Sequence, residues 1–149
     1  MNILMICLGN ICRSPLAEGI LKDKTKEISN IFVDSAGTAS YHVGNLPDVR
    51  SIEIADKHNI NLRDQRARQF SVADFDNFDK IYVMDESNLR DVLSLARNNN
   101  DRKKVDLILN ELENENTNSV PDPYYGGENG FINVFNLLDK ACDSIAKKL

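Results

Sequence analysis

The 149-residue sequence is poor in metal-binding side chains, with only two histidines and three cysteines. His42 and His58 are too few for a metal cluster, and Cys7, Cys12 and Cys142 lack the paired spacing of a zinc site. We therefore expect no metal and no other cofactor. An odd cysteine count, with no leader-like segment ahead of the first apolar run, favours a reducing compartment, so we expect a cytoplasmic protein.

Long apolar runs and an excess of positive charge are also missing. The longest apolar run is far shorter than the ~20 residues that cross a bilayer, so we expect no association with membranes. The net charge is −5, and the charges are intermixed, without the basic stripe that a nucleic-acid partner requires. The length fits a single domain, residues 1–149, that buries roughly two thirds of its unfolded surface.

Short apolar segments alternate along the chain with stretches of helical periodicity, which predicts a parallel sheet. The expected strands are Ile3–Ile6, Ile31–Asp34, Lys80–Met84 and Val105–Leu109. The expected helices are Ser14–Ile28, Asp48–His58, Asp85–Ala96 and Gly130–Lys148. We predict an α/β protein, a single-domain three-layer fold in which helices flank a four-stranded parallel sheet. Ligands of such sheets bind beyond the carboxyl ends of the strands.

Two predicted loops are long for a compact domain, Ser35–Pro47 and Asn114–Asn129. Loops of this length are usually functional. The run Asn98–Asn100 is interpreted as a solvated turn without a function.

The sequence Cys7-Leu8-Gly9-Asn10-Ile11-Cys12-Arg13-Ser14 lies between the first predicted strand and the first predicted helix. Backbone N–H groups of such a turn and the positive end of the helix converge on an anion and favour a thiolate. We expect Cys7 to attack phosphorus and the planar fork of Arg13 to bind two phosphate oxygens. Alternatively, Cys7 ends a buried strand as a small apolar residue and Arg13 is a surface charge.

Local signals favour the phosphate-binding interpretation. Gly9 permits a positive φ and a close approach of the backbone, and Asn10 tolerates the left-handed region. Ser14 followed by Pro15 has the pattern of a helix N-cap with proline at the first helical position. We predict a phosphate-binding loop directly after the first strand.

Asp122 lies between two prolines in the late loop and precedes Tyr124 and Tyr125. Displacement of a phenol from phosphorus needs a proton donor, and hydrolysis of the intermediate needs a base, so one carboxyl group can serve both steps. We expect Asp122 to take these roles beside aromatic walls. The alternative is an ordinary Pro-Asp-Pro turn with tyrosines packed on the surface.

Over nearly its full length the chain resembles the low-molecular-weight protein tyrosine phosphatases. The similarity is carried by residues 7–15 with Ala17-Glu18, and by Asp34-Ser35-Ala36-Gly37-Thr38, Ala67-Arg68-Gln69, Met84-Asp85-Glu86-Ser87-Asn88-Leu89-Arg90-Asp91 and Asp122-Pro123-Tyr124-Tyr125. This resemblance implies the same roles for Cys7, Arg13 and Asp122, and hydrolysis of phosphotyrosine through a phosphocysteine without a metal.

The resemblance also implies supporting and binding roles. Ser14 would steady the thiolate, and Asn10 would hold the loop through hydrogen bonds that include Ser35. The substrate-binding set is expected to be Leu8, Gly9, Asn10, Ile11, Cys12, Ser14, Tyr41 and Tyr124, of which Leu8, Ile11, Tyr41 and Tyr124 flank the substrate ring. In some family members the tyrosines matching Tyr124 and Tyr125 can be phosphorylated.

Two positions bear on variation within the family. Many animal members carry a histidine where this chain has Gln65 and Arg66, which suits a bacterial-type member. Cys12 follows Cys7 inside the same turn, and a nearby thiol can condense with an oxidised thiolate before the oxidation becomes irreversible. The resemblance supports such a redox-sensitive pair, although Cys12 can also be a buried residue that fills the underside of the loop.

Two other functions fit parts of the pattern. Thioredoxin-linked arsenate reductases share the loop, but they need two more cysteines after the third strand, and residues 80–100 contain none. A non-catalytic phosphotyrosine-binding module should lack Cys7 or Asp122. The resemblance suggests a phosphotyrosine-containing partner protein such as a bacterial autophosphorylating tyrosine kinase, while sugar phosphates and phosphoarginine stay open as substrates.

Overall fold

The computed structural model describes residues 1–113 and 118–149, without the side chains of Tyr125 and Glu128. Part of the predicted loop Asn114–Asn129 therefore lies outside the described residues. Four parallel strands form one sheet in the order β2-β1-β3-β4. Their bounds are β1 Asn2–Cys7, β2 Phe32–Gly37, β3 Lys80–Val83 and β4 Val105–Leu107. The predicted α/β class and four-stranded parallel sheet are confirmed.

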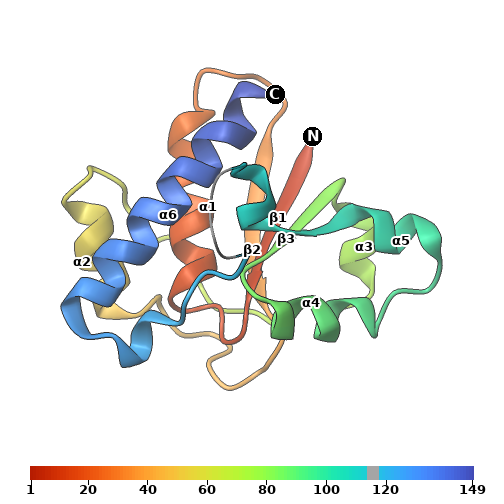
Figure 1. Ribbon diagram of the computed structural model, residues 1–149, viewed down its shortest axis with the longest axis horizontal. Helices are drawn as coiled ribbons and strands as arrows, with labels where there is room; N and C mark the ends of the chain where they lie inside the picture. The colour runs from red at the N-terminus through yellow and green to blue at the C-terminus, as the bar shows by residue number, and fades with distance from the viewer. Residues whose placement is uncertain (114–117) are drawn as a thin grey trace.

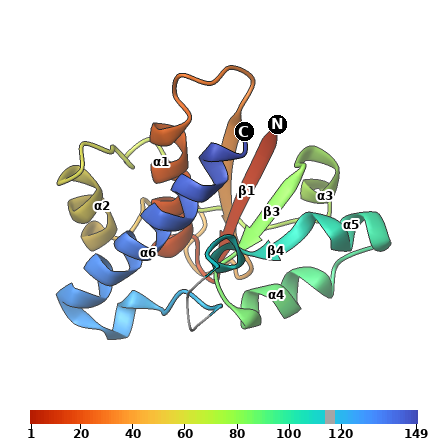
Figure 2. The same ribbon diagram turned by 45° about the horizontal axis from the view of Figure 1, so that its top comes forward.

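Helices cover both faces of this sheet (Figure 1). On one side lie α1 Arg13–Lys24, α2 Val49–Asp56 and α6 Gly127–Lys147, and on the other lie α3 Ala73–Asn77, α4 Glu86–Leu93 and α5 Asn99–Lys104. The turned view in Figure 2 shows the same separation. Two short 3₁₀ helices, η1 Ile108–Glu111 and η2 Pro123–Tyr125, complete the described elements.

The central strand β1 feeds two hydrophobic cores because successive strand residues point to opposite faces of a sheet. Ile3, Met5 and Cys7 belong to the core under α1 and α6, whereas Leu4 and Ile6 belong to the core under α3 and α4. All five side chains are buried. A strand buried on both faces reads as a continuous apolar run, which is the pattern of residues 3–6.

Several predicted boundaries were wrong. Helix α1 begins at Arg13, so Ser14 is inside the helix rather than its N-cap, and the capping position falls on Cys12, whose side chain makes no capping bond. Strand β2 continues through Ser35 to Gly37, which shortens the predicted loop. Such ends are set by pairing with neighbouring strands and by tertiary hydrogen bonds, which local patterns do not contain.

The predicted turn at Asn98–Asn100 was also wrong, because Asn98 caps a helix. Its side chain accepts a hydrogen bond from the backbone N–H of Asp101 at 2.9 Å, and α5 begins at Asn99. Helix α3 was missed as well. Both helices have only five or six residues, too few for a clear apolar period. Among the described residues, no helix is long and apolar enough to cross a membrane.

Candidate active site

The phosphate loop, residues 7–14, connects the end of β1 to the first turn of α1 at the carboxyl edge of the sheet. Backbone N–H groups of Thr38 and Ala39, just after β2, donate to the carbonyls of Cys7 and Leu8 at 3.0 and 2.9 Å. A Cβ at Gly37 would come within 2.8 Å of the Leu8 carbonyl oxygen. The glycine therefore lets the end of β2 pack directly against the loop.

Cys7 lies at the floor of the site with its side chain almost fully buried. Its Sγ is 3.1 Å from the hydroxyl oxygen of Ser14, which in turn accepts a hydrogen bond from Nδ2 of Asn10 at 2.8 Å. Because the Ser14 oxygen already accepts that bond, its own proton is free to point at the sulfur. In that orientation the Ser14 hydroxyl donates to Cys7 Sγ.

Asn10 holds the loop from inside. Its φ of 57° lies in the left-handed region, as the sequence predicts for this residue. Nδ2 also donates to the hydroxyl of Ser35 at 2.9 Å, and Oδ1 accepts from the backbone N–H of Arg68 at 3.0 Å. The amide thus joins α1, β2 and the segment before α3, and these bonds compensate for the strained backbone.

Behind Ser35 lies Glu18, whose role the sequence analysis did not identify. Ser35 donates to Glu18 Oε1 at 2.6 Å, and Lys22 binds Oε2 at 2.6 Å. Burial raises the pKa of Glu18, against the opposing effect of the hydrogen bonds from Lys22 and Ser35. The signal in the sequence was an acid four residues before a lysine on α1, which is common on solvent-exposed helices.

Gln65, one of the two residues in the region of the animal histidine, supports a neighbouring part of the site. Its Nε2 donates to the carbonyl of Pro15 at 3.1 Å, so it contacts the first turn of α1. Within the described residues it makes no hydrogen bond to Asn10. Arg66 uses its guanidinium on the carbonyls of Arg63 and Gln65. Lys22, rather than a residue of this segment, binds the buried Glu18.

Arg13 is buried, and its guanidinium is fixed from one side. Nη1 donates to Asp85 Oδ2 at 2.6 Å and to the carbonyl of Val120 at 3.0 Å. Asp85 itself caps α4 by accepting from the N–H of Asn88 at 2.8 Å. Within the described residues Nη2 and Nε carry no hydrogen bond, so they remain available for two phosphate oxygens. Burial opposes the charge, but Cys7 and Asp85 together raise the pKa of Arg13.

Asp122 reaches the site because its loop is attached to the sheet edge. The N–H of Val120 donates to the carbonyl of Met84, just after β3, at 2.8 Å. Asp122 is exposed, and its Oδ1 accepts from the N–H of Tyr124 at 3.0 Å, which caps the short helix η2. The carboxyl group is therefore oriented by its own backbone while it faces the cavity.

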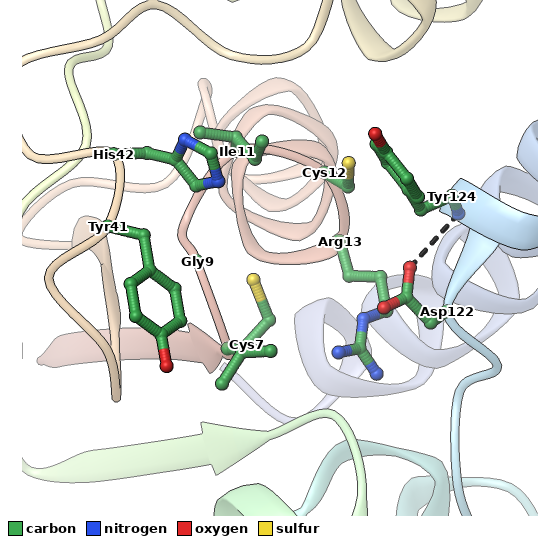
Figure 3. A pocket seen from close by; sticks show the side chains of 10 residues that line it. Cys7, Gly9, Ile11, Cys12, Arg13, Tyr41, His42, Asp122 and Tyr124 are labelled. Atoms are coloured by element: carbon green, nitrogen blue, oxygen red, sulfur yellow. Dashed lines mark hydrogen bonds between the residues drawn. The ribbon is translucent and has the colours of Figure 1, made fainter.

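One cavity of about 230 Å³ brings most of the predicted site together (Figure 3). Tyr41 and His42 stand on one side, Asp122 and Tyr124 on the other, and Cys7 lies between them. The lining residues are Cys7, Leu8, Gly9, Ile11, Cys12, Arg13, Tyr41, His42, Asp122 and Tyr124. Asn10, Ser14 and Ser35 do not line the cavity and act from behind the loop.

His42 also lines the cavity, a position not predicted from the sequence, where the two histidines were interpreted only as possible metal ligands. The His42 ring packs edge-on to Tyr41, with ring centroids 6.5 Å apart. A Cβ at Gly9 would lie 3.0 Å from Cδ2 of His42. Gly9 does not adopt a positive φ, so that part of the prediction was wrong, and the glycine instead makes room for the histidine ring.

Cys12 lines the same cavity as Cys7, and its side chain is buried. Burial raises the pKa of Cys12 to about 12, and the negative charges of Asp48 and Cys7 contribute in the same direction. Cys12 is therefore a neutral thiol at physiological pH. Within the described residues, no cluster of three or more histidine, cysteine or acidic side chains is arranged to hold a metal ion.

The sequence profile of a known family matches nearly the whole chain. The low molecular weight phosphotyrosine protein phosphatase family matches residues 2–149. The chain belongs to this family. It is 43% identical to a low molecular weight protein-tyrosine-phosphatase of Synechocystis that is described as putative, over 100% of this chain and 96% of the relative. It is 38% identical to the human low molecular weight phosphotyrosine protein phosphatase, over 99% and 94% of the two chains.

Solved structures agree with this assignment. A protein tyrosine phosphatase from Entamoeba histolytica superposes with a TM-score of 0.93 at 36% identity, covering 99% of this chain and 96% of the other. Wzb of Vibrio vulnificus, solved with benzylphosphonate, gives 0.88 at 30% identity over 99% and 98%. A Drosophila arginine phosphatase gives 0.92 at 30% identity over 99% and 97%. The chain is a protein-tyrosine phosphatase.

Proposed function

We propose that this phosphatase cleaves phosphotyrosine in proteins with Cys7 as the nucleophile, Arg13 as the phosphate ligand and Asp122 as acid and base. One observation carries the assignment: these three side chains line a single cavity at the carboxyl edge of the sheet. Each of the three side chains is oriented by a hydrogen bond, Cys7 with Ser14, Arg13 with Asp85 and Asp122 with the N–H of Tyr124. The backbone of the phosphate loop supplies further N–H donors for the phosphate oxygens.

In the first step the Cys7 thiolate attacks phosphorus, and the bond from phosphorus to the phenol oxygen breaks. The carboxylic acid form of Asp122 gives its proton to that oxygen, so tyrosine leaves as a neutral phenol. Arg13 stays fixed by Asp85 and neutralises charge on the equatorial oxygens of the transferring group. The product of this step is a phosphocysteine.

In the second step Asp122, now ionised, takes a proton from a water molecule. The water oxygen attacks phosphorus, the phosphorus–sulfur bond breaks, and inorganic phosphate leaves. Ser14, 3.1 Å from the sulfur, receives the departing thiolate with its hydroxyl proton. Asp122 is then protonated and Cys7 is a thiolate again, so the enzyme returns to its starting state.

The exposed aromatic walls favour a flat substrate ring. Tyr41 and Tyr124 are 78% and 55% exposed, so part of each aromatic side chain is open to contact with a phenyl group. Vibrio vulnificus Wzb, which has the same fold, was solved in complex with benzylphosphonate, and this supports a ligand with an aryl group. We also assign Leu8 and Ile11 to this slot, since both line the cavity.

The physiological partner is proposed to be a cytoplasmic phosphotyrosine protein, and among these an autophosphorylating bacterial tyrosine kinase. Similarity to bacterial family members supports this partner, and a free cysteine nucleophile is best preserved in a reducing compartment. Phosphoarginine is the second candidate substrate because a Drosophila relative of the same fold is described as an arginine phosphatase.

A substrate panel tests the proposal directly. Wild type and Cys7→Ser are compared on phosphotyrosine, phosphoserine and phosphoarginine peptides in the presence of EDTA. We expect the wild type to turn over phosphotyrosine fastest, with EDTA without effect, and Cys7→Ser to be inactive on all three. A preference for phosphoarginine would reject the aryl slot, and turnover by Cys7→Ser would reject the nucleophile.

A further inference from the structure

A second cavity, of about 360 Å³, lies between α2 and the beginning of α6. We call it the α2–α6 groove, lined by Arg50, Glu53, Ile54, Lys57, Gly127, Phe131 and Ile132. Arg50, Glu53 and Ile54 of α2 and the C-cap residue Lys57 are spaced at i, i+3, i+4 and i+7, so they lie along one face of that helix. None of the groove residues belongs to the catalytic set.

The groove has an apolar floor and a charged rim. Ile54 and Phe131 are buried beneath it, while Glu53 and Lys57 are exposed at its edge. Within the described residues, neither Glu53 nor Lys57 takes part in an ion pair or a side-chain hydrogen bond. An apolar floor with unpaired charges at its rim is the composition of a site that binds a polypeptide segment.

Arg50 connects this groove to the active cavity. Its guanidinium carbon lies 5.2 Å from the ring centroid of Tyr124, a wall of the active cavity, and 4.6 Å from that of Phe131, in the groove. Asp48 accepts hydrogen bonds from Nε and Nη2 of Arg50, each at 3.1 Å. Because Arg50 is held between two rings and a carboxylate, it forms a fixed partition with a cavity on either side.

We propose that the α2–α6 groove binds the segment of the substrate protein next to its phosphotyrosine, with one large apolar side chain over Ile54 and an acidic side chain at Lys57. The inference rests on the proposed function, since the phosphotyrosine occupies the neighbouring cavity. Arg50 and Lys57 are separated by about 10 Å along α2, which roughly three residues of extended chain would span. The site therefore selects sequence beyond the phosphorylated ring.

The test compares peptides with a substrate too small to reach the groove. Two phosphotyrosine peptides carry leucine three residues and glutamate five residues from the phosphotyrosine, one on the N-terminal and one on the C-terminal side. A third has alanine and glutamine at those positions. p-Nitrophenyl phosphate reports on the active cavity alone. We expect wild type to prefer one Leu/Glu peptide over the third roughly three- to tenfold in kcat/KM, mainly through KM.

Two charge changes at the rim should shift that preference in opposite directions. Lys57→Glu should abolish the preference for the favoured Leu/Glu peptide over the Ala/Gln peptide, and Glu53→Gln should increase that preference. Lys103→Glu is the matched control for Lys57→Glu. Lys103 is exposed on α5, on the other side of the sheet, and both substitutions change the net charge by the same amount. All three variants should cleave p-nitrophenyl phosphate at the wild-type rate.

Equal rates for the three peptides in wild type would overturn the groove proposal, and so would equal effects of Lys57→Glu and Lys103→Glu. Sedimentation at the assay concentration checks whether a second copy of this chain occupies the groove. A dimer that dissociates in the Lys57→Glu variant would show that the groove serves self-association instead. Failure of wild type to hydrolyse both p-nitrophenyl phosphate and the peptides would reject the phosphatase proposal itself. The two failures are therefore distinguishable.

Discussion

The floor of the active cavity and its walls are held in different ways. On the floor, Cys7 and Arg13 are buried, and each forms hydrogen bonds with partners far along the chain or across the loop. On the walls, Tyr41 and Tyr124 are mostly exposed. Groups that do the chemistry are thus in place before substrate arrives, whereas the walls meet the part of the substrate that varies.

This difference predicts two kinds of variant. Changes in the floor should lower the rate for every substrate, because phosphate is common to all of them. Changes in the walls should alter the choice among substrates with smaller effects on the rate. Asp122 lies between the two classes, since its carboxyl acts on the leaving group but sits on the exposed loop.

Cys7→Ser should cause the largest loss. A serine hydroxyl is not ionised in the field of the loop, so turnover should fall by at least about 10⁴-fold on every substrate. Binding of inorganic phosphate, measured by calorimetry, should persist because the loop amides and Arg13 remain. A burst of covalent phosphoenzyme in the variant, with the phosphate at a residue other than position 7, would show that another residue is the nucleophile.

Arg13→Lys should be nearly as damaging. A point charge cannot reproduce a planar fork that binds Asp85 with Nη1 and phosphate with its other nitrogens. We expect kcat/KM to fall on the order of 10²–10³-fold. The variant should also bind phosphate more weakly, unlike Cys7→Ser. Wild-type kcat/KM in Arg13→Lys would reject its assignment as the phosphate ligand.

Asp122→Ala should lower the rate according to the leaving group. The lost proton donor contributes roughly 10²–10⁴-fold for poor leaving groups and least for good ones. A series of aryl phosphates of graded phenol acidity, assayed with both enzymes, measures this as the slope of rate against leaving-group pKa. The variant should have the steeper slope. Parallel lines for variant and wild type would exclude Asp122 as the acid.

The floor was largely predictable from sequence, and only part of the network behind it was. Cys7 and Arg13 of the floor, and Asn10 behind it, lie in one short segment whose residue types each favour the same turn, so local reasoning reaches them. Glu18 and Asp85 act through contacts with Ser35 and Arg13, which are set by how α1, β2 and β3 pack. Local spacing carries no information about such pairs.

For the walls, prediction from the sequence failed at neighbouring residues rather than at distant pairs. Tyr41 was found because the family resemblance names it, while His42, its neighbour, was missed although both line the cavity. Gly9 was explained by backbone freedom, but it is the His42 ring that needs the space. A glycine can be required for its backbone freedom or for the space that its missing side chain leaves. Only the residues that surround it in the structure show which of the two applies.

Tyr41→Ala and Tyr124→Ala should change selectivity more than rate. Each removes an aromatic face worth about 0.5–1.5 kcal/mol of stacking, so we expect a three- to tenfold loss of the preference for phosphotyrosine over phosphoserine peptides. Hydrolysis of an alkyl phosphate should hardly change, which serves as the internal control. An unchanged preference in both variants would place the specificity wall in another loop.

Cys12→Ser should have the smallest effect on basal activity and a distinct effect after oxidation. Peroxide oxidises the Cys7 thiolate to a sulfenic acid with release of water, and the Cys12 thiol can then condense with it, losing a second water to form a disulfide. Wild type should therefore be inactivated reversibly and recover with dithiothreitol. Cys12→Ser should lose activity irreversibly, whereas Cys142→Ala, which removes a buried thiol distant from the cavity, should behave like wild type.

The rate at which the Cys7–Cys12 disulfide forms should depend on pH, because the Cys12 thiol must lose its proton before it attacks the oxidised Cys7. Burial raises the pKa of Cys12 to about 12, so the thiol is neutral at pH 7. At pH values below that pKa, each increase of one pH unit raises the thiolate fraction about tenfold. Since the thiolate is the attacking species, the disulfide should form faster at pH 9 than at pH 7. Intact-protein mass spectrometry follows the loss of two hydrogens after brief peroxide treatment. A yield of disulfide that falls as pH rises, or its absence from wild type, would reject Cys12 as the resolving cysteine.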